Sequence, residues 1–301
     1  MKAVVLATFG QAERLELRDV AEPTPGRDEI KVRVVAAGIN PIDWKLRSGA
    51  LQPYMPIELP AVLGRDVAGE VVAVGAGVTR FRVGARVCGL VRHGYAEYVV
   101  APEDNFAAVP MNLDLVEAAA LPLVLLTGTQ LVEAAVDVHA GESVLVTGAT
   151  GGVGRVAVYV AKRRGGIVYA AVRAAHQVEA AKLGVHGVVA LDDERQVETL
   201  PELDALADTV GGPTTQKLLP KLKRAGRIGS VVGEPPGAKE LGLVVRAFMA
   251  HPDAKRLEEL VNDVAAGTLV IPILRKFPLR EAAQAHQLAE NGGAGKVLLT
   301  T

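Results

Sequence analysis

The sequence has one cysteine, Cys88, among 301 residues. A single cysteine excludes an intrachain disulfide and any metal site built from several thiolates of one chain. Nothing charged adjoins Cys88 to activate its thiol, so we expect a buried, small apolar residue and not a nucleophile. A reducing, cytoplasmic setting is the expectation that follows.

An excess of one charge is also lacking, because 33 basic residues stand against 34 acidic residues. This balance gives no electrostatic footprint for nucleic acid or for an anionic membrane. No apolar run approaches the roughly 20 residues that span a bilayer. The first apolar segment, Ala3–Ala7, is shorter than a signal-peptide core. We therefore expect a soluble protein with a small-molecule ligand.

What the sequence contains is a change of pattern along the chain. Up to about residue 110, short β-rich segments are broken by glycine and proline, which is typical of a partly closed antiparallel barrel. The strands expected there are Ala3–Ala7, Glu29–Ala37, Asp66–Val74, Arg86–Leu90 and Ala96–Ala101.

From Leu115 onward, strands and helices alternate, which predicts a parallel, doubly wound sheet. The first units expected are a strand at Ser143–Thr147, a helix at Gly152–Arg164 and a strand at Ile167–Val172. Further apolar, β-branched runs follow at Val188–Leu191, Ala205–Val210 and Gly226–Val232.

After Gly267 the pattern changes again, to an extended Leu269–Ile273, a helix near Leu279–Glu290 and a strand at Lys296–Thr300. We expect this tail to return to the first domain. The predicted fold is thus α/β, with a β-rich domain at 1–118, a Rossmann domain at 119–266 and the return at 267–301. A cleft is expected where the two domains meet.

A glycine-rich turn, Gly148-Ala149-Thr150-Gly151-Gly152-Val153-Gly154, connects the strand at Ser143–Thr147 to the helix that follows. In this context glycines permit a tight turn and a close approach of pyrophosphate to the backbone, and the helix N-terminus holds the phosphates. The turn therefore predicts dinucleotide binding. A glycine turn needed only for packing is the alternative.

The end of the next strand favours one cofactor. NAD-binding domains carry an acidic residue there for the ribose 2′-hydroxyl. Here Ile167–Val172 is followed by Arg173-Ala174-Ala175-His176, without a carboxylate. Arg173 offers a permanently charged fork for a 2′-phosphate, so we expect NADPH over NADH. A solvated surface arginine is the alternative.

Two backbone segments lie where ligands bind in such sheets. Val210 follows the fourth strand of the expected sheet, and Val232 and Gly233 follow the fifth. Ligands bind at the carboxyl edge of parallel strands, so backbone groups here are candidates to hold the carboxamide of the cofactor. In the first domain, Tyr54 is a phenol in a proline-rich loop that could stack on an acceptor ring or simply pack.

Together these features resemble the medium-chain dehydrogenase/reductase superfamily, in its zinc-independent NADPH:quinone oxidoreductase (zeta-crystallin-like) branch. The resemblance covers essentially the whole chain. Its motifs, besides the glycine turn and the Ala161-Lys162 after it, are Ala37-Gly38-Ile39-Asn40-Pro41-Ile42-Asp43, Leu63-Gly64-Arg65-Asp66-Val67-Ala68-Gly69, Gly94-Tyr95-Ala96-Glu97-Tyr98, Asp208-Thr209-Val210-Gly211-Gly212 and Gly295-Lys296-Val297-Leu298-Leu299.

The resemblance implies a GroES-like catalytic domain, a Rossmann domain, a homodimer, and NADPH-dependent reduction of a quinone or an enone. It places Asn40 and Asp43 in a loop facing the cleft, and Thr127 near the cofactor. Asn40 could donate to a substrate oxygen or stabilise its own turn. Asp43 could act at the substrate or cap the helix that follows. Thr127 could hold the nicotinamide or bond back to its own helix.

The resemblance also bears on zinc. Zinc-dependent relatives carry a cysteine in the first motif and a His-Glu pair in the second, where this chain has Asn40 and Arg65-Asp66. Neither replacement leaves the thiolate or imidazole ligand expected at those positions, and the six histidines show no ligand spacing. Without zinc, oxidation of an alcohol would lack its Lewis acid, whereas an acceptor that delocalises electrons onto oxygen makes a smaller demand.

Three functions remain open from the sequence. The first is hydride transfer from NADPH to a quinone. The second is reduction of a carbon–carbon double bond conjugated to a carbonyl, in an enone or an enoyl thioester; the basic run Lys217, Lys221, Lys223, Arg224 and Arg227 would suit the phosphates of a thioester carrier. The third is a non-catalytic NADPH-binding protein with a structural or redox-sensing role.

Overall fold

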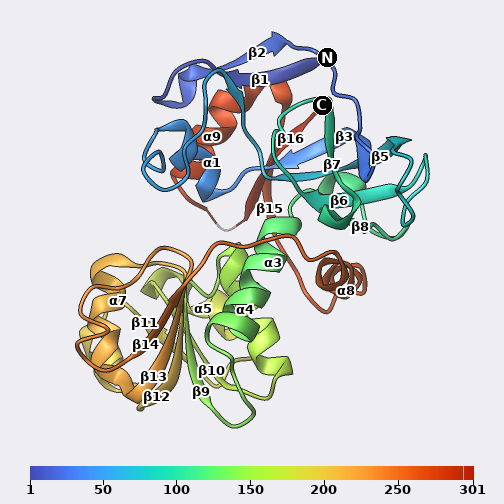
Figure 1. Cartoon of the computed structure of the whole chain (residues 1–301). Helices are drawn as coiled ribbons and strands as arrows, with labels where there is room; N and C mark the ends of the chain where they lie inside the picture. The colour runs from blue at the N-terminus through green and yellow to red at the C-terminus, as the bar shows by residue number, and fades with distance from the viewer. Residues whose placement is uncertain (294) are drawn as a thin grey trace. The chain divides into compact units, whose positions relative to one another are not determined.

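The computed structural model describes residues 1–293 and 295–301 and divides into two compact units (Figure 1). The first unit is made of residues 1–123 and 251–301, and the second of residues 124–250. We expected the later boundary near 266, but helix α8 (Ala254–Ala265) belongs to the first unit. It is held there because Asn112 Nδ2 donates to the Ala265 carbonyl at 3.0 Å and Arg80 pairs with Glu258.

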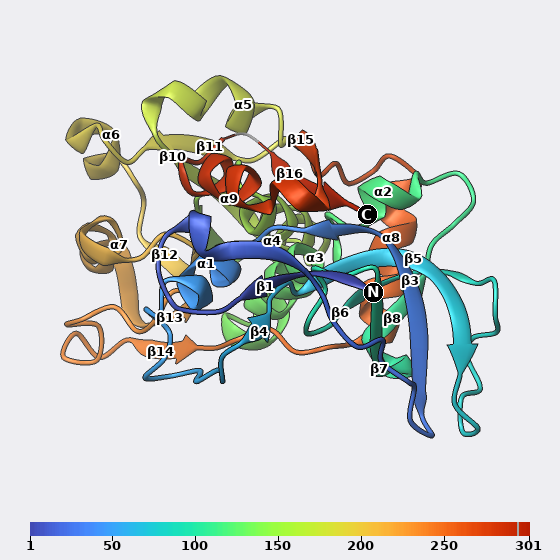
Figure 2. The same ribbon diagram turned by 90° about the horizontal axis from the view of Figure 1, so that it is seen from above.

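The first unit contains a seven-stranded sheet and a smaller three-stranded sheet. The large sheet runs in the order β15 (Ile273–Pro278), β16 (Lys296–Thr300), β3 (Glu29–Gly38), β5 (Asp66–Val74), β6 (Arg86–Leu90) and β8 (Phe106–Ala108), with β7 (Tyr98–Pro102) paired to β3. The small sheet has the order β2 (Leu15–Asp19), β1 (Lys2–Leu6) and β4 (Ala61–Val62). Figure 2 shows the long antiparallel pair β3 and β5 side by side.

The register of this sheet places the two motifs of the first domain together. Asp66, the first residue of β5, pairs with Gly38 of β3 and with Leu90 of β6. A Cβ on Gly38 would lie 2.4 Å from the Ala119 carbonyl oxygen, so β3 can end here only on glycine. Asn40 and helix α1 (Pro41–Arg47) follow directly. Helix α2 (Leu115–Ala118) contacts both strands.

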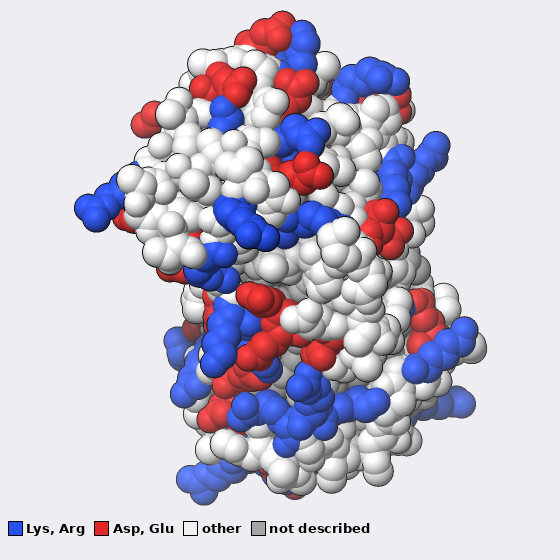
Figure 3. Space-filling model, turned by 90° about the vertical axis from the view of Figure 1, so that its right-hand side faces the viewer, with Lys and Arg blue, Asp and Glu red and all other residues white. Residues whose placement is uncertain are grey.

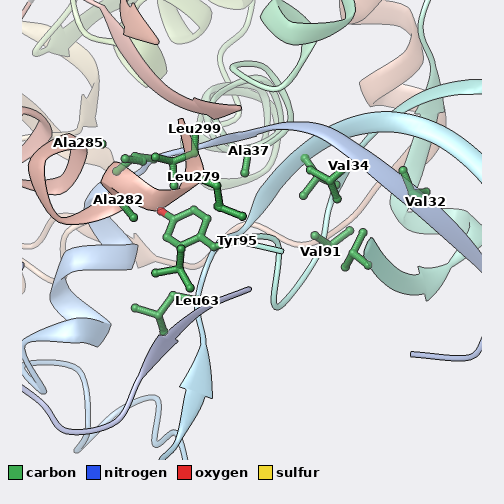
Figure 4. Packing of buried hydrophobic residues seen from close by; sticks show 14 of the residues in the cluster. Val32, Val34, Ala37, Leu63, Val91, Tyr95, Leu279, Ala282, Ala285 and Leu299 are labelled. Atoms are coloured by element: carbon green, nitrogen blue, oxygen red, sulfur yellow. The ribbon is translucent and has the colours of Figure 1, made fainter. Parts of the chain in front are cut away.

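The core of the first unit joins both of its stretches of sequence. Alternate residues of β3 are buried, as the pleat of a strand requires. Figure 4 shows Tyr95 packed among Leu63, Leu279 and Ala282, so the C-terminal segment closes the same core. Helix α9 (Ala282–Glu290) lies within the range predicted for it.

One extended segment expected in the tail does not coincide with a strand of the structure. The sequence favoured an extended segment at Leu269–Ile273, whereas β15 begins at Ile273 and pairs in parallel with β16. Pro272 has no N–H to donate to a ladder, and its carbonyl accepts from the Lys296 N–H at 2.8 Å. The apolar side chains before it, Leu269 and Ile271, are buried without forming a strand.

The second unit is a six-stranded, wholly parallel sheet, which confirms the predicted α/β class. Its order is β11 (Gly187–Ala190), β10 (Ile167–Val172), β9 (Ser143–Thr147), β12 (Leu203–Asp208), β13 (Leu222–Ser230) and β14 (Val244–Ala247). The strand order reverses between β9 and β12, and dinucleotides bind at such a switch point.

Helices cover both faces of this sheet, and Figure 1 shows α4 and α7 on opposite sides. The helices of this unit are α3 (Pro122–Gln130, which begins in the first unit), α4 (Gly152–Arg163), α5 (Gln177–Ala181), α6 (Glu194–Glu198) and α7 (Gly212–Leu218). Val156 and Val160 of α4 are buried one turn apart, which is the spacing of a helix face against a sheet. The chain leaves α4 through Gly165 at φ +80°.

The surface and the single cysteine agree with the composition. On the face in Figure 3, acidic and basic side chains are interspersed. Cys88 is fully buried in β6, so the expected buried position is confirmed, and burial raises the pKa of its thiol well above the usual value. No helix of the described residues is long and apolar enough to cross a membrane.

Candidate functional site

The glycine-rich turn connects β9 to α4 in the second unit. Gly148 has a φ of +61°, in the left-handed region that favours glycine. A Cβ on Gly154 would lie 2.1 Å from the Gly148 carbonyl oxygen, and a Cβ on Gly148 would lie 2.6 Å from Thr209 Oγ1. The turn can therefore close this tightly only with glycine at both positions.

The N-terminus of α4 offers backbone donors. The helix begins at Gly152, and Gly151 before it has no side chain to cap the first amides. These amides have no intrahelical partner, and the helix dipole adds positive charge. A pyrophosphate is the kind of ligand that such an end binds. The residues of the turn thus fit the phosphates of a dinucleotide.

Thr127 lies close to this helix. It is 7 % exposed on α3. A Cβ on its neighbour Gly128 would lie 2.8 Å from the Val153 carbonyl oxygen, so α3 passes against the first turn of α4. Thr127 is therefore near the glycine turn, and its role toward the cofactor stays a prediction.

Asp208, the last residue of β12, is a buried acceptor that the sequence analysis did not single out. Its Oδ1 accepts from the hydroxyls of Thr147 at 2.9 Å and Thr215 at 2.8 Å, and from the Gly211 N–H at 3.0 Å. Its Oδ2 accepts from Ser230 Oγ at 3.2 Å. Because Thr147 ends β9 and Ser230 ends β13, one carboxylate fixes the carboxyl ends of three neighbouring strands.

Val210 and Val232 follow β12 and β13, and they are 47 % and 38 % exposed although apolar. Ser230 Oγ accepts the Val232 N–H at 3.2 Å, so the hydroxyl that Asp208 holds also holds this loop. A Cβ on Gly211 would lie 2.8 Å from Val232 Cγ2. The two loops touch at the carboxyl edge of the sheet, where ligands of such folds bind.

Asn40 lies in a buried polar cluster of the first unit and is 1 % exposed. Its Nδ2 donates to Asp66 Oδ2 at 2.8 Å, and its Oδ1 accepts from Lys296 Nζ. Lys296 also donates to the Ile39 carbonyl at 3.0 Å and lies 3.4 Å from Asp66 Oδ2. Both ends of the Asn40 amide are therefore engaged within the protein. The side chain orients the loop before α1.

Asp43 ends a directed chain of hydrogen bonds. Arg47 can only donate, so His286 Nδ1, 3.2 Å from Arg47 Nη1, must accept. His286 Nε2 then carries the hydrogen and donates to Tyr95 Oη at 3.2 Å, and the Tyr95 hydroxyl donates to Asp43 Oδ2 at 2.9 Å. At the other end, Glu290 accepts from Arg47 Nη2 at 2.8 Å.

The same carboxyl also serves the helix N-terminus, because Asp43 Oδ2 accepts the Asn40 N–H at 2.8 Å. This is the capping contact that the sequence offered as an alternative to a catalytic role. With Oδ2 accepting from two donors, a proton on Asp43 belongs on Oδ1. Oδ1 is buried and has no hydrogen-bond partner among the described residues.

Burial has the largest effect on the pKa values of the residues in this series of hydrogen bonds. It raises the pKa of Asp43 to about 7, although the Asn40 N–H and the Tyr95 hydroxyl oppose the rise. It lowers the pKa of His286 to about 3, with the charge of Arg47 adding to the effect, so His286 is neutral as its contacts require. Burial also raises the pKa of Tyr95. Asp43 is thus the residue of this hydrogen-bond series whose pKa lies near neutral pH.

Comparison with known proteins identifies the family. The family model described as "Alcohol dehydrogenase GroES-like domain" matches residues 26–111, and "Zinc-binding dehydrogenase" matches residues 183–299. A chloroplast envelope quinone oxidoreductase homolog of Arabidopsis thaliana is 30 % identical over 96 % of this chain and 95 % of its own. A 2-haloacrylate reductase of a Burkholderia species is 31 % identical over 95 % and 94 %.

A solved structure agrees with these relatives. The quinone oxidoreductase of Escherichia coli, complexed with NADPH, has a TM-score of 0.88 and 28 % identity, with both chains covered fully at 100 %. The chain belongs to the medium-chain dehydrogenase/reductase superfamily, among its quinone oxidoreductases. It is an NAD(P)-dependent oxidoreductase enzyme, and the alternative of a non-catalytic binding protein is set aside.

The end of β10 is where the 2′-phosphate of the cofactor is expected to bind. Arg173 is exposed after β10, and no acidic side chain pairs with it among the described residues. However, Asp192, which follows β11, accepts the Ala174 N–H at 2.8 Å. The segment that follows β10 has no carboxylate of its own, but the parallel neighbour strand supplies one close to it.

The residues do not fit a zinc ion at the positions where zinc-dependent members carry ligands. Asn40 is engaged with Lys296 and Asp66, and Arg65 brings a permanent positive charge. Zinc prefers thiolate, imidazole and carboxylate ligands that converge. The described residues contain no group of three or more His, Cys, Asp or Glu side chains that could hold a metal.

Tyr54 stands apart from the buried cluster. Its side chain is 85 % exposed in the loop after α1. It makes no contact with Asn40 or Asp43 among the hydrogen bonds of the described residues. Its role toward a substrate stays a prediction.

Proposed function

We propose that this enzyme transfers a hydride from NADPH to a quinone without zinc. The observation that carries the proposal is the glycine turn at the β9–β12 switch point, with uncapped amides at the start of α4. The quinone oxidoreductases among its relatives, one of them complexed with NADPH, support the acceptor and the cofactor.

Each part of the second unit has a role in this proposal. The amides of Gly151–Gly154 hold the pyrophosphate, and Arg173 holds the 2′-phosphate. The exposed loops at Val210 and Val232–Gly233, together with Thr127, hold the nicotinamide end. When bound, NADPH supplies the hydride. The protein contributes position and a fixed electrostatic environment, which suffices for an acceptor that spreads negative charge onto oxygen.

In the first unit, Asn40 and Asp43 determine the shape and the charge of the part that binds the substrate. Tyr54 stacks on the acceptor. Asn40 acts by holding the loop, since both ends of its amide are engaged within the protein. Asp43 can hold a proton near neutral pH on Oδ1, the oxygen that the protein leaves free.

A second candidate acceptor is a carbon–carbon double bond conjugated to a carbonyl. The 2-haloacrylate reductase among the relatives favours it. A thioester carrier has less support, because the basic run is largely engaged: Lys217 pairs with Glu194, Lys223 with Asp204 and Arg227 with Glu142, while Lys221 donates to the Glu198 carbonyl.

The test is NADPH oxidation, followed by its absorbance, against 1,4-benzoquinone, 2-cyclohexenone, benzaldehyde and crotonyl-coenzyme A. We expect turnover with the quinone and a lower rate with the enone, in protein whose metal content is measured. Reduction of benzaldehyde alone, in proportion to bound zinc, would overturn the proposal.

We also propose that the enzyme is a homodimer. Among the described residues, the edge strand β14 pairs with β13 alone, and Leu241, Val244 and Met249 around it are 54 %, 45 % and 56 % exposed. An exposed apolar edge strand is a template for pairing with a second chain. Light scattering coupled to gel filtration should give twice the chain mass of 31.5 kDa, and a monomer mass at micromolar concentration would contradict the proposal.

A further inference from the structure

Arg65 differs from the buried cations of the first unit because it has no counterion among the described residues. Arg47 pairs with Glu290, and Lys296 is within 3.4 Å of Asp66. Arg65 is only part-buried, yet it takes part in no ion pair or side-chain hydrogen bond among the described residues, and its Nε is buried without a partner. The terminal nitrogens of this guanidinium are therefore free donors.

The backbone holds Arg65 firmly in this position. Gly64 before it has a φ of +100°, and a Cβ there would lie 2.5 Å from Tyr95 Cδ1. The Arg65 carbonyl accepts the Val91 N–H at 2.7 Å, where β5 and β6 meet. Arg92 follows Val91, so two arginines stand at the adjacent ends of paired strands.

The charges around Arg65 do not neutralise it. Burial lowers the pKa of its guanidinium, and the charge of Arg92 lowers it further, while Asp43 and Asp66 act in the opposite sense. Both carboxyls are fully buried, and Asp66 is already engaged with Asn40, Lys296 and the Leu123 N–H. A part-buried cation without a partner costs folding free energy. A ligand with negative charge would offset that cost.

Resting on the second candidate acceptor of the proposed function, the conjugated carbon–carbon double bond, we propose that Arg65 binds a negatively charged oxygen of the acceptor, with Arg92 as the second cation, and that the acceptor class is an α,β-unsaturated carboxylate. A guanidinium fork matches the two oxygens of a carboxylate, and a second arginine favours a resident charge over a transient one. The other source of the same chemistry is the oxygen of a neutral quinone or enone, which becomes negative during reduction.

A matched pair of acceptors tests the proposal. Acrylate and methyl acrylate share the reducible bond and differ in the carboxylate. Loss of a charge-assisted contact in Arg65→Gln should raise KM for acrylate about 10-fold to 100-fold. KM for methyl acrylate and for NADPH should stay within about twofold, which is the ordinary scatter of a surface substitution. Arg65→Lys, which keeps the charge and loses the fork, should fall between.

Arg82→Gln is the matched control, since Arg82 is an exposed arginine of the same unit. Should Arg65→Gln instead lower kcat for methyl acrylate and 1,4-benzoquinone at unchanged KM, the carboxylate acceptor class is overturned, and Arg65 acts on the oxygen that becomes negative during reduction. Equal behaviour of Arg65→Gln and Arg82→Gln with every acceptor would overturn the proposal. Circular dichroism and thermal unfolding confirm that each variant is folded.

Binding of benzoate, an aromatic carboxylate that cannot be reduced here, separates this proposal from the proposed function. Calorimetry on the protein without cofactor should detect benzoate binding in the parent chain and in Arg82→Gln, and at least about tenfold weaker binding in Arg65→Gln. Benzoate binding without any NADPH oxidation would retain the Arg65 site and reject the function. Quinone reduction without benzoate binding, and without an effect of Arg65→Gln, would retain the proposed function and reject the Arg65 site.

Discussion

At the scale of single residues, the two buried carboxyls Asp43 and Asp66 show how partners decide chemistry. Burial raises the pKa of both. Lys296 lies beside Asp66 Oδ2, and the Asn40 amide donates to the same oxygen. The Leu123 N–H donates to Oδ1. Asp43 has donors on one oxygen only. Asp43 is therefore the carboxyl that can hold and release a proton near neutral pH.

Stability should depend on pH through Asp43. Its folded-state pKa of about 7 lies above the usual 3.8, so the folded state binds the proton more tightly than the unfolded state. The resulting stabilisation is fully present below about pH 4 and is lost as the pH rises to about 7. At 1.36 kcal/mol per pH unit, the upper bound is about 4 kcal/mol.

Asp43→Asn stays neutral and keeps an acceptor for Tyr95, so this part of the pH dependence should disappear from its free energy of unfolding. Urea unfolding of both proteins between pH 4 and pH 8 measures the difference. The groups acting on Asp43 are Asn40, Tyr95, Asp66, Lys296 and Arg65, and none is altered by the substitution. Parallel pH curves for the two proteins would contradict the assignment of the proton to Asp43.

Cofactor preference should depend on Arg173 and Asp192. Removing the charge in Arg173→Ala should weaken NADPH binding about 10-fold to 100-fold, because a charged hydrogen-bond donor to the 2′-phosphate is lost. NADH binding should be unchanged. Asp192→Asn should improve NADPH binding modestly, since a nearby negative charge is removed. Fluorescence titration of the parent and both variants with each cofactor measures these affinities, and an equal loss for both cofactors in Arg173→Ala would exclude a role in binding the 2′-phosphate.

The sequence reached part of this residue-scale account. Glycines 148 and 154 could be predicted because their role is local to one turn. The hubs Asp208, Tyr95 and His286 could not, since some of their partners lie far away in sequence: Thr147 is 61 positions from Asp208, and His286 is 191 positions from Tyr95. The same holds for Asp192, whose carboxylate reaches Ala174 only because β10 and β11 are parallel neighbours.

At the scale of elements, the β9–α4 turn depends on the closeness of the helix to the strand. In Gly154→Ala the new Cβ would meet a backbone oxygen at 2.1 Å, so the turn must open. Overpacking of this kind costs about 1–3 kcal/mol, which corresponds to roughly 5-fold to 150-fold weaker NADPH binding. Gly151→Ala is the matched control, with its closest contact at 3.2 Å. Calorimetric titration that ranks the two variants alike would argue against this geometry.

The contact between α1 and α9 depends on Arg47, whose side chain is 1 % exposed. Arg47→Met keeps the apolar stem and leaves Glu290 and His286 Nδ1 without their donor. We expect a loss of about 2–3 kcal/mol in the free energy of unfolding. Arg33→Met, which removes an exposed pair with Glu70, should cost less than about 1 kcal/mol. Chemical denaturation compares them, and a cost as small as that of Arg33→Met would show that the buried pair contributes little.

Regular elements were the easiest to predict from sequence. Strands at Asp66–Val74, Arg86–Leu90, Ser143–Thr147 and Ile167–Val172 have the predicted limits. Three of them are followed directly by Gly75, Gly148 or Arg173, which mark the end of the apolar run. The tail was harder. Helix α8 was not predicted, and the strand expected before Pro272 lies after it, because pairing with β16 decides its place.

At the scale of the whole molecule, changes in the spacing of apolar residues along the sequence predicted a β-rich segment, an α/β segment and a tail that rejoins the first domain. The observed units follow that order, with the first unit made of two separate stretches. Their limits depend on packing, since α8 joins the first unit through Asn112 and Arg80. The identity of the acceptor is not encoded in any periodicity, and it rests on Arg65, Asp43 and the relatives.

The central claim is zinc-free hydride transfer from NADPH to a conjugated acceptor. The most direct measurement is single-turnover oxidation of NADPH by 1,4-benzoquinone in protein treated with a chelator and verified free of metal, with ordinary NADPH and with NADPH deuterated at the transferred position. The account predicts a rate that chelation leaves unchanged and deuteration slows. A rate that vanishes on chelation and returns with added zinc would contradict it.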